Sequence, residues 1–339
     1  MQLKDEEINE SIVLKPTINE FKEEIRNLNI SSEIKSIILN DDEILSLLFD
    51  QKIHPEKYIL MNETKTTMEG FVDDADLEWL YIPDNIKRIW FYKKENSNAS
   101  KKNGNFSTKT RKKEIKRLII TAVDWLDDYA FCSNYIFGEI YAPKVTFIDD
   151  YIFYKGNIKH IDLPKLTFIS ESAFESSTLE TINAPKVSEI FIDAFVKSKI
   201  THIDFPEIEE IEGGVFRRSK LRSINAPKLK EIGGWTFEET KLKHVNLPEL
   251  EIIGPGAFEK TPLELVNAPK LKIIESEAFK RTKLKHVNFP KLERIEEEAF
   301  ADSSLKSINA PSLLILKPNA FEGTRNKETL LEKFKSIQK

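Results

Sequence analysis

Proline recurs at a fixed spacing of 21 residues from residue 143 to residue 311. Phenylalanine recurs with the same spacing, ten residues after each proline. The prolines are Pro143, Pro164, Pro185, Pro206, Pro227, Pro248, Pro269, Pro290 and Pro311, and the phenylalanines run from Phe153 to Phe321. A constant period of about 20 to 30 residues is typical of a solenoid, whose units bury their apolar side chains only by stacking on one another.

Within one unit, the apolar residues alternate around Ile224 in the segment Leu221–Pro227, which predicts a short strand with Ile224 and Ala226 pointing inward. Proline then ends the strand, because it has no N–H for the ladder. A Ser or Thr two residues before each new Leu position can satisfy backbone groups in the turn between coils. The rest of a 21-residue unit is too short for a long helix, so we expect turns or short 3₁₀ pieces opposite the strands.

The repeating unit reads L-x-x-[IV]-x-[ALF]-P-x-[LIV]-x-x-I-x-x-x-[AV]-F-x-x-[ST]-x, and LKEIGGWTFEETKLKHVNLPEL (229–250) shows it well. It resembles the leucine-rich repeats of the BspA-like class over roughly residues 115–325. The units are shorter than is usual for that family, and Ser or Thr stands where Cys or Asn is common. The resemblance implies an α/β leucine-rich-repeat solenoid with a parallel strand face, used as a binding scaffold and tied to no single activity.

A second period of 42 residues lies within the first. The residue before each proline alternates between small and large, as in Ala184, Phe205, Ala226 and Leu247, so we expect neighbouring coils to interleave in the core. Four of the five histidines follow the same rule and share one position, four residues before the prolines of the large-residue coils. They are His160, His202, His244 and His286.

These histidines and an Asp or Asn two residues later should line the exposed strand face. Histidines on alternate coils are about 10 Å apart, whereas a metal needs each donor at about 2 Å, so we expect no metal site. The first interpretation of both rows is structural: a polar histidine row that packs on aliphatic stems, and a ladder of stacked amides. A role in partner contact or pH sensing stays open.

The ends of the chain differ from the array. We expect residues 1–68 to form an acidic N-terminal capping or accessory region, with a divergent repeat as one interpretation. The solenoid should span 69–325, interrupted at 92–114 by a disordered loop rich in Lys, Ser and Asn. At 326–339, the helical spacing of Leu330, Leu331, Phe334 and Ile337 predicts a C-terminal capping helix.

Composition narrows the class of protein. The formal net charge is −5, so we do not expect nucleic acid as the partner, and no apolar run approaches the roughly 18 residues of a membrane span. Cys132 is the only cysteine, which excludes a disulfide framework. The first ten residues, MQLKDEEINE, lack the apolar segment of a secretory signal, so we expect a cytoplasmic protein, with unconventional export as an alternative.

Catalytic motifs are absent from the sequence, which contains no H-E-x-x-H, no G-x-S-x-G and no phosphate-binding or dinucleotide-binding glycine pattern. We therefore expect a non-enzymatic protein without a cofactor, monomeric, that binds a protein partner through the strand face. The alternatives are a self-assembling component of a surface layer or particle, and an exported effector or adhesin.

The strand segments suggest which partner chemistry this face would favour. From five residues before each proline to one after it, they hold 11 Lys or Arg and 7 Asp or Glu, although the whole chain is acidic. This basic stripe includes Lys159, Lys165, Arg222, Lys228, Lys243, Lys285, Lys291 and Lys306. An acidic protein surface is the expected partner. The candidate contact residues are His160, His202, His244, His286, Arg222, Lys243, Lys285, Asn225, Asn246, Asn267 and Asn288.

Overall fold

The computed structural model describes residues 135–335 without a gap and, before them, residues 19, 22, 23 and 26, six short strands up to residue 126, and residue 131. The chain divides into two units, Met1–Leu60 and Met61–Lys339. In the first unit, the described part consists of the four helical positions and β1 (Tyr58–Leu60). Most of 1–68, which we interpret as a cap, and residues 92–112 of the predicted disordered loop 92–114 lie outside the described residues.

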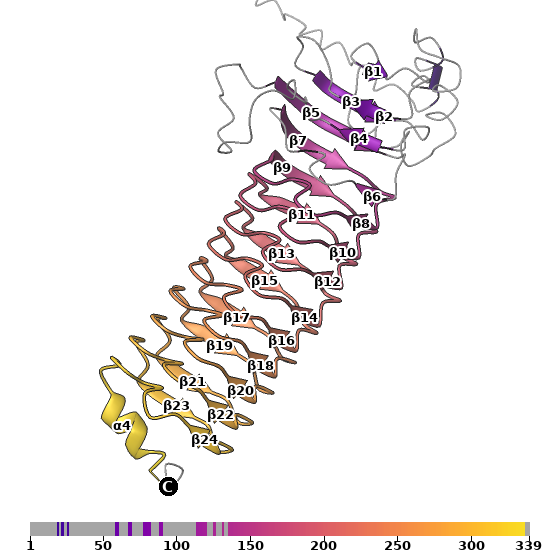
Figure 1. Ribbon diagram of the computed structural model, residues 1–339. Coiled ribbons are helices and arrows are strands. Elements are labelled where there is room, and N and C mark those ends of the chain that lie inside the picture. Colours follow the sequence, from indigo (N-terminus) through magenta and orange to yellow (C-terminus); the bar gives the residue numbers. More distant parts are fainter. Residues whose placement is uncertain are drawn as a thin grey trace, which may run out of the picture. The chain divides into compact units, whose positions relative to one another are not determined.

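The second unit is a solenoid of stacked coils, and each coil contributes two parallel strands (Figure 1). The longer, odd-numbered strands are β7 (Tyr135–Tyr141), β9 (Asn157–Asp162), β11 (Thr181–Asn183), β13 (His202–Asp204), β15 (Ser223–Asn225), β17 (His244–Asn246), β19 (Leu265–Asn267), β21 (His286–Asn288) and β23 (Ser307–Asn309). The even-numbered strands are β8 (Phe147–Ile148), β10 (Phe168–Ile169), β12 (Glu189–Ile190), β14 (Glu210–Ile211), β16 (Glu231–Ile232), β18 (Ile252–Ile253), β20 (Ile273–Ile274), β22 (Arg294–Ile295) and β24 (Ile315–Leu316).

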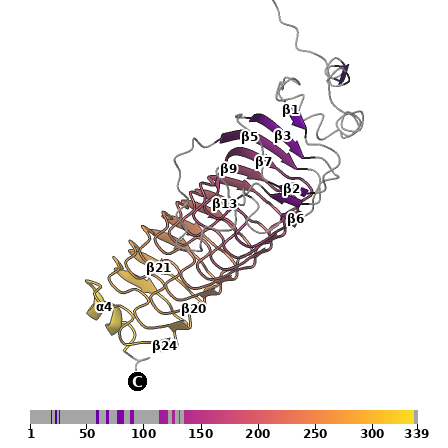
Figure 2. The same ribbon diagram turned by 45° about the horizontal axis from the view of Figure 1, so that its top comes forward.

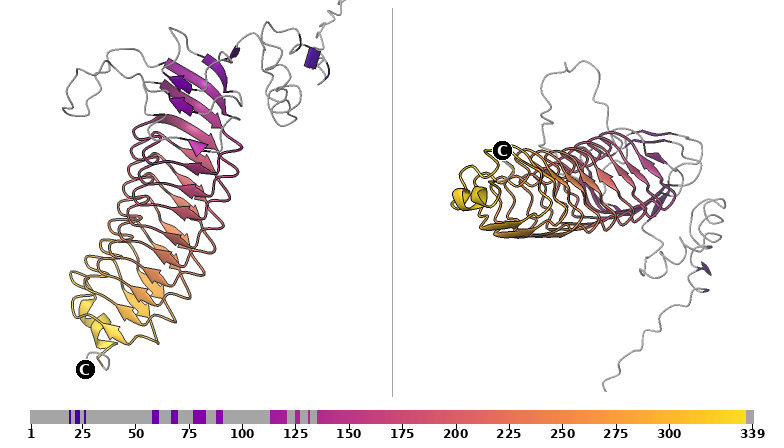
Figure 3. Two further views of the ribbon diagram at one scale, coloured as in Figure 1. Left: turned by 45° about the vertical axis from the view of Figure 1, so that its right-hand side comes forward. Right: turned by 90° about the horizontal axis from the view of Figure 1, so that it is seen from below.

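Each coil therefore presents three surfaces, which Figures 2 and 3 show from other directions. We call them the odd-strand face (β9 to β23, with the three residues that lead into each strand), the even-strand face (β8 to β24) and the turn face, which runs from each even strand to the Ser or Thr four residues before the next odd strand. The predicted parallel strand face is confirmed. The turn face consists of turns in the described residues, and the even-strand face is an addition that the sequence analysis did not foresee.

The array continues toward the N-terminus in a less regular form. β2 (Thr67–Glu69) pairs with β4 (Arg88–Trp90) in a register of 21 residues, Thr67 opposite Arg88. β3 (Leu77–Ile82) pairs with β5 (Lys113–Ile120) across the inserted segment, and β6 (Trp125–Leu126) pairs with β8. The strands β3 and β4 lie within the predicted solenoid span, before the insertion, and β5 begins two residues inside the predicted insertion.

The recurring phenylalanines form one continuous stack in the core. Ring centroids of successive coils lie 4.7 to 5.8 Å apart, from Phe131 through Phe153 to Phe321. All of these side chains are buried, so their packing contributes most of the apolar burial on the turn side of the core. The residues before the prolines, including Ala184, Phe205 and Ala226, are buried as well, which confirms that this alternating position faces the core.

The 42-residue period is visible in the backbone hydrogen bonds of the odd strands. From β13 onward these strands pair two by two, β13 with β15, β17 with β19 and β21 with β23, in separate sheets. In each pair the large residue before proline donates its N–H to the next coil; Phe205 donates to Asn225 O over 3.0 Å, and Leu247 to Asn267 O over 2.9 Å. The structural repeat on this face is therefore the pair of coils.

The Ser and Thr column acts as predicted. Thr240, Thr261 and Thr282 are buried, and each donates its hydroxyl to a phenylalanine carbonyl three residues earlier over 2.8 Å. The serines of this column differ, because Ser219 Oγ accepts the Leu221 N–H over 3.4 Å, while buried Ser198 Oγ has no partner in the described structure.

A short helix ends the described chain. α4 (Lys327–Glu332) is smaller than the predicted 326–339, since Phe334 lies in the turn that follows it. Leu330 and Phe334 are buried on the core, and Lys333 Nζ donates to Ile308 O of β23 over 2.9 Å. The predicted C-terminal helix is confirmed, and it covers the odd-strand side of the last coil.

Candidate partner-binding face

The odd-strand face carries the side chains that the sequence singles out. In each short odd strand the first and third residues point outward and the second points into the core, as in His202, Ile203 and Asp204. This is the alternation that a half-buried strand requires. The predicted histidine and asparagine rows therefore lie side by side on one surface.

Three of the four histidines bond to the hydroxyl of the next coil. Nδ1 lies 2.5 Å from Thr181 Oγ1 for His160, 2.7 Å from Ser223 Oγ for His202, and 2.8 Å from Ser307 Oγ for His286. A hydroxyl can donate or accept, so this contact suits both the neutral and the charged imidazole. The fourth, His244, stands opposite Leu265 and makes no hydrogen bond within the described residues.

The asparagine row consists of bonded pairs. The side-chain amides of Asn225, Asn267 and Asn309 each donate to the residue one coil back, over 2.6 to 2.7 Å. Asn183 donates in the same way to Asp162 over 2.8 Å, and partial burial raises the pKa of the Asp162 carboxyl while this hydrogen bond opposes the rise. The amide contacts follow the coil pairs, which supports the structural interpretation of Asn225, Asn246, Asn267 and Asn288.

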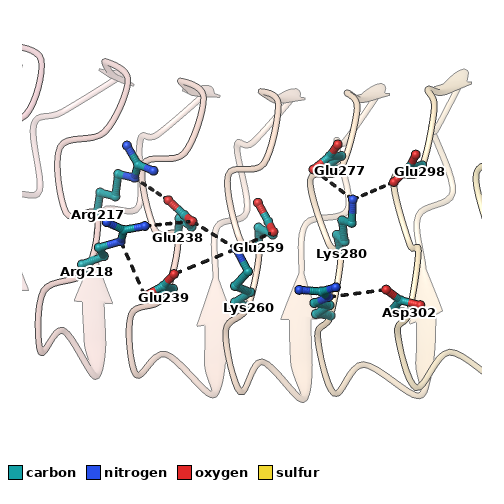
Figure 4. A network of polar contacts seen from close by, with 11 residues as sticks. Arg217, Arg218, Glu238, Glu239, Glu259, Lys260, Glu277, Lys280, Glu298 and Asp302 are labelled. Atoms are coloured by element: carbon teal, nitrogen blue, oxygen red, sulfur yellow. Dashed lines mark hydrogen bonds and ion pairs between the residues drawn. The ribbon is translucent and has the colours of Figure 1, made fainter. Parts of the chain in front are cut away.

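Most cations on the turn face are neutralised within the protein (Figure 4). The Glu238 carboxylate has a side-chain exposure of 3% and pairs with Arg217, with Arg218 over 4.0 Å and with Lys260 over 3.5 Å. Farther along, Lys280 Nζ lies 2.6 Å from Glu298 Oε2 and 3.3 Å from Glu277 Oε2. A buried carboxylate with three cations around it is satisfied, so this network contributes to the stability of the turn face.

Cations beside the even strands are paired as well, most of them with a glutamate one coil earlier. The Lys230–Glu209 and Lys272–Glu251 distances are 2.6 and 2.7 Å, and each ammonium lowers the pKa of its glutamate below the ordinary value. Lys228 belongs to this set, 2.6 Å from Glu207. The basic stripe therefore contains one lysine that is paired internally, with a partner 21 residues away in the sequence and one coil away in space.

Most cations around the odd strands have no such partner; the exceptions are Lys228 and Lys270, each one residue after a proline of the repeat. Arg222, Lys243 and Lys285 are exposed and immediately precede β15, β17 and β21. Two further Lys or Arg side chains of the described residues 159–325 also lack an ion pair but lie away from the odd strands, Lys197 and Arg325. The unpaired cations in the odd strands and their flanking turns are Lys159, Lys165, Lys186, Lys199, Lys220, Arg222, Lys241, Lys243, Lys283, Lys285, Lys291 and Lys306.

Two features of this face were missed at the sequence level. Lys199, Lys220, Lys241 and Lys283 form a second basic column three residues before the odd strands, and Leu265 is 54% exposed in the histidine-facing column. The lysine column has the 21-residue spacing, so reading the charges coil by coil would have found it.

The described part of the chain holds neither a candidate metal cluster nor a candidate membrane-spanning helix. Among them, no group of three or more His, Cys, Asp or Glu side chains could hold a metal ion. In that same part of the chain, no helix combines the length and the apolar character needed to cross a bilayer. The face is an extended polar surface with unpaired positive charge, which suits contact with another macromolecule.

Comparisons with known proteins agree with this architecture. The family model described as BspA type leucine rich repeat region (6 copies) matches residues 110–221 and 209–328. No curated protein matches the chain.

Several solved structures are similar to this chain at low sequence identity. A leucine rich cell surface protein from Faecalibacterium prausnitzii is 18% identical, with 75% of this chain and 81% of that chain covered and a TM-score of 0.37. The pneumococcal vaccine antigen PcpA is 15% identical, with coverage of 79% and 89% and a TM-score of 0.38. A leucine-rich repeat protein from Eubacterium ventriosum is 14% identical, with coverage of 76% and 90% and a TM-score of 0.35.

Proposed function

Because this chain belongs to the BspA-type leucine-rich repeat family, we propose that it is a non-catalytic protein that binds an acidic protein surface through its odd-strand face. Repeat solenoids bind through extended faces, where many modest contacts add up without a deep pocket. The family supports a binding role in general, and the choice of face and partner chemistry is our own inference.

One observation carries the proposal. The turn face and the even-strand face neutralise most of their cations internally, whereas the odd strands and their flanking turns hold twelve unpaired Lys and Arg side chains against two paired ones, Lys228 and Lys270. An internally paired cation must give up its partner before it can meet an external carboxylate. Unpaired cations on one surface attract an acidic partner at no such cost and speed its association.

The same charges argue against self-assembly through this face. Two copies that met odd-strand face to odd-strand face would place lysines against lysines, which is repulsive. A monomer is therefore the expected state, and sedimentation at high protein concentration would test it. The cytoplasmic location that the sequence favours stays a prediction.

The test is retention of the full chain on immobilised polyglutamate at low and high salt. Reversing Arg222, Lys243 and Lys285 to Glu should weaken retention at least about tenfold at low salt, and added salt should remove the difference, because exposed charges are screened. The matched control reverses Lys230 and Lys272, which directly precede even strands, and Arg294, which begins β22. Equal retention of the wild-type chain and the first variant would overturn the choice of face.

A further inference from the structure

One residue of the odd-strand face departs from the pattern of its column. Thr181, Ser223 and Ser307 each bond to the histidine of the preceding coil, and Leu265 stands in the same register opposite His244. A leucine cannot form that bond, so His244 is the histidine of the row without a hydrogen bond in the described residues. Leu265 is also 54% exposed, so its apolar surface is not used to stabilise the core.

Leu265 is alone in this respect on its face. The other exposed large apolar side chains of the described residues are Ile192, Trp235, Leu314 and Ile315, which lie on the turn and even-strand faces. A chain that breaks a regular local rule without a stabilising gain does so most often at a functional position. Apolar anchors surrounded by polar contacts are the usual centres of binding interfaces.

The charged side chains beside Leu265 indicate the chemistry of the partner segment that such an anchor would contact. The preceding coil places Lys243 next to His244, and the following coil places Lys285 next to His286; both lysines are exposed and unpaired. In the coil of Leu265, Glu264 is the acidic neighbour, so the two flanking coils carry the positive charge. Parallel strands are about 4.8 Å apart, which puts one cation within reach on each side of the leucine.

We propose that Leu265 is the specificity-determining anchor of the odd-strand face. It receives an apolar side chain from an acidic polypeptide segment, whose flanking carboxylates meet Lys243 and Lys285. This inference rests on the proposed function and adds a requirement to it: acidity alone attracts the partner, and an apolar residue within the acidic segment decides which partner is held.

The probes are two fluorescently labelled heptapeptides, each with three glutamates on either side of a central residue, which is leucine in one and serine in the other. Fluorescence anisotropy at low salt measures their affinities for the full chain. The wild type should prefer the leucine peptide by about tenfold, which corresponds to partial burial of one leucine side chain. Leu265→Ser should lose this preference and keep its affinity for the serine peptide.

The substitution has a built-in structural check, because serine is the residue that Ser223 and Ser307 place in this column. Leu265→Ser should therefore fold, and its His244 imidazole should take on the NMR shifts of the hydroxyl-bonded His202. Leu265→Thr, which copies the hydroxyl of Thr181, is a second variant with the same expectation. The matched control is Leu314→Ser, which removes a leucine of 68% exposure beside the even strands and should leave the preference intact.

The outcomes separate this inference from the proposed function. Equal binding of both peptides by the wild type, with loss of both in the Arg222, Lys243 and Lys285 reversal, would overturn the role of Leu265 and leave the basic face standing. A preference that persists in Leu265→Ser, or one that disappears in Leu314→Ser, would also overturn it. Failure of both peptides to bind the wild type at low salt would overturn the inference and the proposed function together.

Discussion

The side-chain amide of Asn225 donates to Asp204 Oδ1 over 2.7 Å, one coil back, and within the described residues no such bond joins Asn225 to Asn246, one coil forward. The backbone shows the same asymmetry, because β15 pairs with β13 and belongs to a different sheet from β17. Small and large core residues alternate with the same period, Ala226 after Phe205. The amide hydrogen bonds, the strand pairing and the size of the core residues therefore share one period, and two coils form one structural unit.

A deletion that removes one whole two-coil unit should destabilise the protein less than a deletion that removes a single coil. Removing 42 residues, 242–283, joins Lys241 to Leu284 and keeps the order of small-residue and large-residue coils. Removing 21 residues, 242–262, places the coils of Ala226 and Ala268 side by side and should cost roughly 1–3 kcal/mol more through a void. Thermal melting of both variants makes the comparison, and equal midpoints would show that the alternation is incidental.

Ser198 should be a site where one substitution stabilises the solenoid. Its buried hydroxyl has no partner, whereas threonine in the same position of other coils, as in Thr261, donates to a phenylalanine carbonyl over 2.8 Å. Ser198→Thr should form that bond to Phe195 O and raise stability by about 1 kcal/mol. Urea denaturation measures the change. Ser219→Thr is the control, with a smaller expected gain because Ser219 Oγ already accepts a hydrogen bond; a larger gain there would contradict the explanation.

Asp162 should make stability depend on pH. Burial raises the pKa of this carboxyl in the folded protein, so its ionised form opposes folding at neutral pH, and that effect disappears as the pH falls through the raised pKa. Asp162→Asn should therefore raise the melting temperature at pH 7 and have little effect near about pH 3. Asparagine fits the site, since Asn246 accepts the same hydrogen bond from Asn267 over 2.6 Å.

The control for this prediction is Asp204→Asn, in the same column but on an exposed side chain. It should change the melting temperature little at either pH. If Asp162→Asn stabilised the protein equally at both pH values, the gain would come from packing and not from titration.

Much of the architecture could be read from spacing alone, because a solenoid repeats each environment at a constant interval. Phe237 and Thr240 were placed correctly in this way, one in the buried stack and the other bonded to a backbone carbonyl. The even strands were not foreseen, since a two-residue strand such as Glu231–Ile232 is too short to show an alternating pattern.

The candidate face was harder to predict than the fold. Lys228 and Arg222 look alike in the sequence, and only the neighbouring coil shows that Glu207 neutralises the first while the second has no partner. Leu265 carried a visible signal, an apolar residue in a column of threonine and serine. Its meaning depended on the hydrogen bonds between His and hydroxyl groups, which only the structure reveals.

The most direct test of the account is amide hydrogen exchange of the full chain, measured by mass spectrometry with and without bound polyglutamate at low salt. We predict slower exchange in the odd strands and in the turns that lead into them, 220–225, 241–246 and 283–288, with little change in the even strands. The turn-face network around Glu238 should also be unaffected, because its cations are already paired. Protection confined to the even strands or to the turn face would contradict the claim that the odd-strand face is the binding surface.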